Sequence, residues 1–154
     1  MKRLTLYFSA LVLALGLLTF PTGQSLFADG GANHRVRNLN YGVSGGNVKD
    51  ITRRFCCSGT LGSLVQANGV QYILSNNHVL GLAGKAQAGD DVSQPGLIDN
   101  NCAVHTVVAD FTVAPGLNTG VDAAIAQLRP GLMNSTGAIE DIGAISSVVK
   151  APAV

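Results

Sequence analysis

The stretch TLGSLVQANGVQYILS, residues 60–75, decides the fold class of this 154-residue chain. At its centre stands Asn68-Gly69, a pair that favours the tight two-residue turn of a β-hairpin. On both sides of that pair apolar residues recur with a period of two, as a half-buried strand requires. The stretch therefore predicts two antiparallel strands, Thr60–Ala67 and Val70–Ser75.

The rest of the chain continues this pattern of short strands. Ala103–Thr112 and Asp122–Leu128 have the length and alternation of further strands. Glycine and proline pairs separate the segments, and no stretch carries several turns of an amphipathic helix. Gly42–Asn47, rich in glycine, is expected to form a turn. The predicted fold class is all-β, a barrel or a sandwich.

Residues 1–28 differ in composition from the rest of the chain. Lys2 and Arg3 precede the uncharged apolar run Leu4–Phe20, and a short segment ending at Ala28 follows. This order is typical of a secretory signal peptide, and an uncleaved membrane anchor is the alternative. We therefore expect an extracytoplasmic protein, secreted or periplasmic, that has no membrane contact after signal cleavage.

The charge balance excludes one large class of partner. The chain has a formal net charge of +1, and only 12% of its residues are charged. Nucleic-acid binding requires a basic footprint on one face, so no nucleic acid is expected as a partner. Arg53 and Arg54 are interpreted as solvated flanks. No spacing of cysteine and histidine is typical of a zinc site, and neither a metal nor a cofactor is expected.

Three cysteines, Cys56, Cys57 and Cys102, allow at most one internal disulfide. A disulfide is compatible with the oxidising compartment that a signal peptide implies. We predict that Cys57 pairs with Cys102, which leaves Cys56 free or available to a partner outside the chain.

Two polar residues stand at the ends of predicted strands, where a rigid scaffold holds a side chain at a fixed angle. His78 follows the hairpin closely, and Asp122 begins a segment of small and apolar residues. An imidazole is the natural partner of such a carboxylate. Together they form the base and the orienter of an acyl-transfer triad. A structural histidine and a strand-end cap are the alternatives.

The blocks around these two residues resemble a known family. The segments CSGTL at 57–61, YILSNNHVL at 72–80 and VDAAIA at 121–126 look like the first half of a trypsin-like serine protease with the chymotrypsin fold. The likeness is closest to the bacterial and plant branch that includes the Narrow-leaf-type proteins. The resemblance implies that His78 is the general base, that Asp122 orients it, and that residues 57–130 form the first of two β-barrels.

The nucleophile of this family is missing from the chain. No Gly-Asp-Ser-Gly block follows Asp122, and neither Ser135 nor the pair Ser146-Ser147 has that context. We therefore expect the N-terminal fragment of a secreted serine endopeptidase, inactive alone, whose complete form acts on polypeptides. Residues 29–56 would be an N-terminal arm, and residues 131–154 would begin the segment between the barrels. The alternative is a secreted non-enzymatic β domain that binds a partner, and the oligomeric state stays open.

Overall fold

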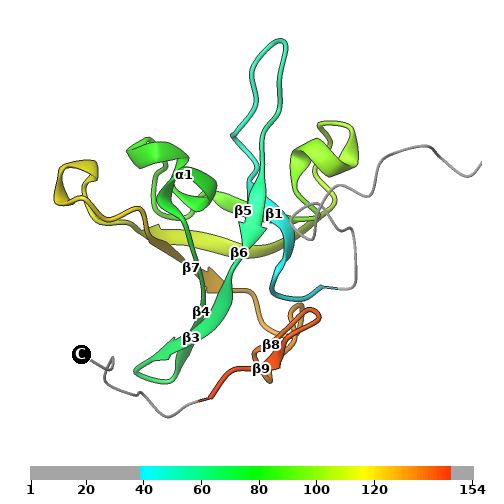
Figure 1. Ribbon diagram of the computed structural model, residues 1–154. Helices are drawn as coiled ribbons and strands as arrows, with labels where there is room; N and C mark the ends of the chain where they lie inside the picture. The colour runs from blue at the N-terminus through cyan, green and yellow to red at the C-terminus, as the bar shows by residue number, and fades with distance from the viewer. Residues whose placement is uncertain (1–38, 147–154) are drawn as a thin grey trace, which may run out of the picture.

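The computed structural model describes residues 39–146, and within them nearly all regular structure is β (Figure 1). The main body is a seven-stranded antiparallel sheet in the order β2-β1-β5-β6-β7-β4-β3, accompanied by a small sheet of β8 and β9. The predicted all-β class is confirmed. The predicted signal peptide and residues 147–154 lie outside the described residues. No helix among residues 39–146 is long and apolar enough to cross a membrane.

The strands and the helical segments are all short. α1 has a single turn, and three 3₁₀ turns lie in loops. The strands are β1 (Val43–Asn47), β2 (Gly59–Leu61), β3 (Ser63–Ala67), β4 (Val70–Ser75), β5 (Asp91–Gln94), β6 (Thr106–Val113), β7 (Ala124–Leu128), β8 (Ala138–Ile139) and β9 (Gly143–Ala144). The helical segments are α1 (Asn77–Leu80), η2 (Leu82–Gly84), η3 (Leu97–Asn100) and η4 (Leu117–Thr119).

The sheet curls until its two outer strands approach each other. β2 and β3 stand at opposite ends of the strand order, yet only Gly62 separates them along the chain. The sheet therefore has to bend round on itself, as in a barrel. A Cβ atom at Gly62 would lie 2.5 Å from the Leu74 carbonyl oxygen, so this corner requires glycine. The predicted strand Thr60–Ala67 is accordingly two strands, broken at the corner.

The apolar core lies between the curled strands and α1. Val79 and Leu80 are buried and pack the helix against this core. A Cβ atom at Gly59 would lie 2.4 Å from Val79 Cγ2, so the helix approaches the backbone of β2 closely. This packing fixes the helix that contains His78. The buried cluster consists of Tyr41, Leu61, Ile73, Val79, Leu80, Val92, Val108, Ala109, Phe111, Ala124 and Ala126.

One strand contradicts the sequence expectation outright. The turn predicted over Gly42–Asn47 is wrong, because β1 occupies most of that range and all of its residues are buried. β1 pairs with both β2 and β5, so it belongs to the sheet although it lies within the expected arm, residues 29–56. Glycines such as Gly45 are the reason why the sequence pattern indicated a turn here. A Cβ atom there would overlap the side chain of Leu61, so the glycine serves close packing instead.

β5 was not expected either, because its residues are mostly polar. Gln94 is buried, but its side chain accepts a hydrogen bond from the Asn40 backbone N–H at 2.9 Å and donates one to the Asn40 carbonyl at 2.8 Å. Ser93 is also buried and donates to the Pro95 carbonyl oxygen. Satisfied polar groups of this kind are tolerated in a core, and hydropathy patterns do not reveal them.

The central hairpin follows the prediction. β4 has the predicted bounds, Val70–Ser75. Asn68 and Gly69 take positive φ angles of 50° and 79°, the conformation of a type I′ turn. β6 and β7 overlap the predicted strands Ala103–Thr112 and Asp122–Leu128 but begin a few residues later.

The disulfide joins Cys56 to Cys102, and Cys57 is an exposed free thiol. The predicted pairing of Cys57 with Cys102 is therefore wrong. Consecutive side chains of an extended segment point in opposite directions, so only one of the two adjacent cysteines can face a given neighbour. The Cα atoms of Cys56 and Cys102 are 5.5 Å apart, which fits a disulfide.

Candidate active site

The pairing of β4 with β7 brings His78 and Asp122 together. These strands run antiparallel, with Ser75 opposite Ala124. α1 begins just after β4 ends, and Asp122 lies just before β7 begins. The register therefore places both residues at the same end of the strand pair, although 44 positions separate them in the sequence.

Both carboxylate oxygens of Asp122 accept hydrogen bonds. His78 Nδ1 lies 2.5 Å from Asp122 Oδ2, and the His78 backbone N–H donates to Oδ1 at 3.1 Å. Asn76 Nδ2 donates to the Asp122 carbonyl oxygen at 3.1 Å and to Oδ2 at 3.3 Å. Because an ionised carboxylate only accepts, Nδ1 carries a proton, and in the neutral imidazole Nε2 is then the nitrogen with the free lone pair.

The electrostatics favour an ionised Asp122. The hydrogen bond from the His78 side chain is the main cause that lowers the pKa of Asp122, and backbone hydrogen bonds of His78 and Asn77 act in the same direction. Solvent reaches both side chains, since His78 is 63% and Asp122 47% exposed. Among residues 39–146, no hydrogen-bond partner occupies His78 Nε2.

Two buried asparagines hold α1 in place. Asn77 donates through Nδ2 to the Pro115 carbonyl oxygen at 3.3 Å and accepts through Oδ1 from the Gly84 N–H at 3.1 Å. Asn47 in β1 donates to the Leu80 carbonyl oxygen at 2.9 Å. Locked neighbours of this kind position a functional side chain. The sequence pattern assigned no role to either asparagine, because a buried asparagine cannot be distinguished locally from a turn residue.

An open cavity of about 370 Å³ lies beside His78. Residues 49–52 form one part of its lining, and Leu82, Ala83 and Lys85 form another. Leu82 and Ala83 take φ angles of 52° and 53°, which are strained for residues with a Cβ atom. The surrounding fold must impose this conformation, and such strain is concentrated at functional sites. The cavity leaves room for a ligand next to the imidazole.

One cation of this cavity is already paired. Lys49 Nζ lies 2.5 Å from Asp90 Oδ1, and the Asp90 side chain is only 7% exposed. The hydrogen bond from Lys49 is the main cause that lowers the pKa of Asp90, with the Gln87 backbone N–H second. This ion pair holds the Lys49 side chain in place, next to residues 50–52 that also line the cavity.

The serines considered from the sequence are not brought to His78. Ser135 lines a separate cavity of about 580 Å³, together with residues of the β3–β4 hairpin. Ser146 lines another, beside Leu64. Residues of the β3–β4 hairpin line both cavities, and His78 lines neither. In the ribbon that hairpin lies at the opposite end of the molecule from α1 (Figure 1). Ser147 lies outside the described residues. Within residues 39–146, the couple of His78 and Asp122 can accept and return a proton, but no serine, threonine or cysteine is hydrogen-bonded to His78 Nε2.

Comparison with known proteins does not identify a family. No family model, curated protein or solved structure matches the chain. Membership of the trypsin-like family therefore stays a prediction, and the functional argument depends on the geometry of the site.

Proposed function

We propose that the seven-stranded sheet, which adds β1 to the strands of residues 57–130, belongs to the first half of a secreted trypsin-like serine endopeptidase, with His78 as general base and Asp122 as its orienter. The 2.5 Å contact between His78 Nδ1 and Asp122 Oδ2 is the observation that carries this proposal. The sequence blocks around both residues and the curled all-β scaffold support it.

The proposed chemistry is peptide hydrolysis through an acyl-enzyme. His78 Nε2 accepts the proton of a serine hydroxyl while the serine oxygen attacks the carbonyl carbon of the substrate. The peptide C–N bond then breaks, the imidazolium gives this proton to the leaving amine nitrogen, and the acyl group stays on the serine oxygen. Water next attacks the carbonyl carbon of this ester while His78 Nε2 takes its proton; the ester C–O bond breaks, the proton returns to the serine oxygen, and the carboxylic acid leaves. Asp122 stabilises the imidazolium without taking its proton, and the lowered pKa of Asp122 favours that role.

The serine and the groups that stabilise the oxyanion would be supplied by polypeptide outside residues 39–146. The exposure of the couple supports such a covering element, because a hydrogen-bonded charge pair acts more strongly once water is excluded. Val113 and Val121, near the Asp122 end of β7, are 54% and 48% exposed. Apolar surface next to the couple is what a second packed domain would cover.

The test begins with the source DNA, read through and past codon 154 in all three frames. The proposal expects a Gly-Asp-Ser-Gly block there. The chain extended through that block should hydrolyse peptides and react with a fluorophosphonate probe. His78→Ala should lower kcat/KM roughly 10⁴-fold or more, because the serine loses its base. His105→Ala, which removes another exposed histidine, should leave activity unchanged.

A different result would contradict the proposal directly. If no frame encodes such a block, or if the extended chain hydrolyses peptides equally well without His78, the couple has no catalytic role. The alternative function, a secreted β domain that binds a partner, would then be favoured.

A further inference from the structure

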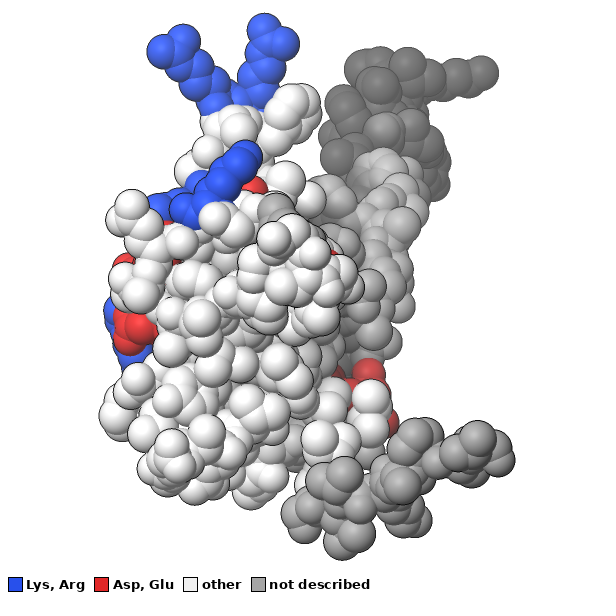
Figure 2. Space-filling view, turned by 90° about the vertical axis from the view of Figure 1, so that its left-hand side faces the viewer, with Lys and Arg blue, Asp and Glu red and all other residues white. Residues whose placement is uncertain are grey.

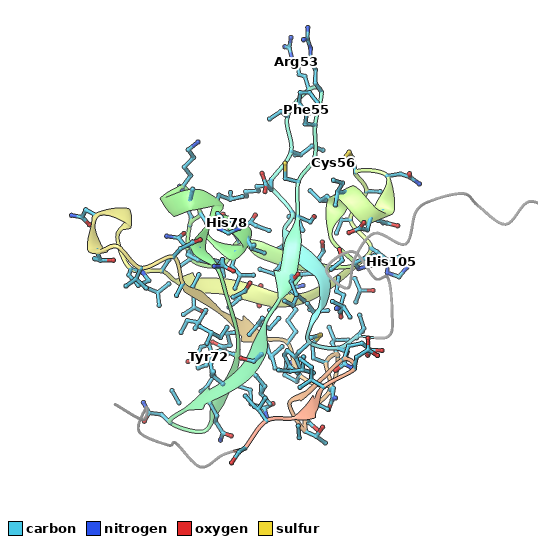
Figure 3. All side chains as sticks on the ribbon, viewed as in Figure 1. Arg53, Phe55, Cys56, Tyr72, His78 and His105 are labelled. Atoms are coloured by element: carbon cyan, nitrogen blue, oxygen red, sulfur yellow. A yellow bond between two sulfur atoms is a disulfide. The ribbon has the colours of Figure 1, made fainter. Side chains whose placement is uncertain are left out.

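The connection between β1 and β2 projects far from the body of the molecule. Residues 48–58 form a hairpin that rises above the sheet, and Arg53 and Phe55 lie at its outer end (Figures 1 and 3). The five residues from Ile51 to Phe55 are all exposed, and Phe55 is 70% exposed. The tip therefore has no packing against the core.

Two adjacent arginines, Arg53 and Arg54, occupy this tip. Basic side chains stand out from the same end of the molecule in the space-filling view (Figure 2). Neither arginine has a carboxylate partner among residues 39–146. An exposed, unpaired dibasic step is the feature that endopeptidases selective for paired basic residues recognise.

The other lysines and arginines among residues 39–146 have ion pairs or backbone hydrogen bonds that hold them to the body of the molecule more firmly than the tip arginines. Arg129 lies 2.7 Å from both Asp91 and Asp110, and its backbone N–H bonds to the Val108 carbonyl oxygen. The backbone N–H of Lys85 bonds to carbonyl oxygens of the turn between α1 and η2. Lys49 is paired with Asp90 next to the buried end of β1.

A protease binds its substrate as an extended segment, so the tip has to open before it is cut. Opening breaks only exposed bonds. The main ones are the Thr52 N–H to the Phe55 carbonyl oxygen at 2.7 Å and the Phe55 N–H to Thr52 Oγ1 at 3.1 Å. Exposed segments without packing open at little cost in free energy.

The base of the hairpin stays closed during such an opening. The Cys57 N–H bonds to the Asp50 carbonyl oxygen at 2.9 Å, and the disulfide ties Cys56 to Cys102. The opening is therefore confined to residues 51–55, and β1 and β2 keep their register.

We propose that the peptide bond between Arg54 and Phe55 is a processing site for an endopeptidase selective for paired basic residues. Water is the co-reactant: its hydroxyl joins the carbonyl carbon of Arg54, and its proton goes to the nitrogen of Phe55. The products are a new carboxylate at Arg54 and a new amine at Phe55. This inference does not depend on the proposed peptidase activity of the chain itself.

The cut molecule remains assembled without a covalent link between its two pieces. The N-terminal piece contains β1, whose Val43 is fully buried and pairs with Leu61 of the other piece. Cys56 and Cys102 both belong to the C-terminal piece. Residues 50–52, which line the cavity beside His78, lose their connection to β2, so the cut frees one wall of that cavity.

The test is limited digestion of the native full chain, with mass spectrometry used to map every cut within residues 39–146. Two probes are compared: an endopeptidase selective for the bond after paired arginines, and trypsin, which needs only one basic residue. Both should cut first after Arg54. Arg54→Gln should abolish the cut after position 54 with either enzyme, because the basic side chain before the cleaved bond is gone. Trypsin should then cut after Arg53 in the same exposed tip, whereas the pair-selective enzyme has lost its paired site.

Arg53→Gln separates recognition of the pair from simple exposure. It should slow the pair-selective enzyme and leave the trypsin cut after Arg54 nearly unchanged. Lys85→Gln, a matched loss of one positive charge, should change neither rate. The cut protein should elute at the intact mass in native size exclusion. It should separate into two pieces on a denaturing gel even without reductant.

Three results would overturn the proposal. The first cut within residues 39–146 could fall after Lys49, Lys85 or Arg129. The pair-selective enzyme could cut Arg53→Gln as fast as the original chain. The two pieces could dissociate under native conditions.

Discussion

At the scale of single residues, the couple of His78 and Asp122 depends on which ring nitrogen holds the proton. Asp122 accepts from Nδ1 and also from the His78 backbone N–H, so one carboxylate fixes both the ring and the turn that bears it. Asn76 adds a third donor. An imidazole held this way presents Nε2 as the acceptor, which is the form that a general base requires.

Asp122→Asn should abolish the downfield proton NMR signal of the His78 Nδ1–H, because the amide is a much weaker acceptor than the carboxylate. In the original chain the signal should persist as the pH falls through about 3.9, the ordinary aspartate value. The reason is the direction of the shift: the lowered pKa keeps Asp122 ionised there, and the hydrogen bond is lost only at lower pH.

His105→Gln is the control for this assignment, since the His105 ring is hydrogen-bonded to the adjacent Thr106 hydroxyl and not to a carboxylate among the described residues. It should leave the signal in place. A signal that survives in Asp122→Asn would show that the couple does not form in solution.

At the scale of elements, the corner between β2 and β3 lets two consecutive strands pair at opposite ends of the strand order. β3 pairs with β4 in the register that the Asn68-Gly69 turn sets. β2 instead pairs with β1, at the other end of the strand order of the curled sheet. Gly62 makes this change of partner possible, because the Leu74 carbonyl leaves no space for a side chain.

Gly62→Ala should therefore lower the free energy of unfolding by about 1–3 kcal/mol, the usual cost of overpacking against a backbone that cannot yield. The measurement is the urea midpoint followed by far-UV circular dichroism. Ser63→Ala, the adjacent half-buried position, should change the free energy by less than about 0.5 kcal/mol. Equal midpoints for the two variants would mean that the corner is not tightly packed.

At the scale of the whole molecule, the disulfide connects the base of the projecting hairpin to the segment after η3. Cys56 and Cys102 are 46 positions apart, so the bond closes a loop that contains the β2–β4 region, α1 and β5. A cross-link of this span removes much conformational freedom from the unfolded chain.

Cys56→Ser should lower the free energy of unfolding by about 3–4 kcal/mol, according to the dependence of disulfide stabilisation on loop length. Cys57→Ser should leave it nearly unchanged, because that thiol is free and exposed. Denaturant midpoints and a thiol count under non-reducing conditions provide the check. A loss of this size in Cys57→Ser, with little change in Cys56→Ser, would instead support the pairing of Cys57 with Cys102.

The sequence by itself determined the features whose causes are local. The turn at Asn68-Gly69, the bounds of β4 and the lack of long helices among residues 39–146 follow from backbone preferences and from a period that a few neighbours define. The sequence blocks also indicated the candidate couple of His78 and Asp122, whose catalytic role stays a proposal.

Only the tertiary structure decided the features that depend on distant partners. β1 is a strand because Leu61 and Val79 pack where its glycines leave space. Cys56, not Cys57, reaches Cys102, because the hairpin determines which side each cysteine faces. His78 meets Asp122 through the register of β4 and β7. The physical reason is common to all three. Burial and register are set by contacts between residues far apart in the chain, and no local pattern encodes them.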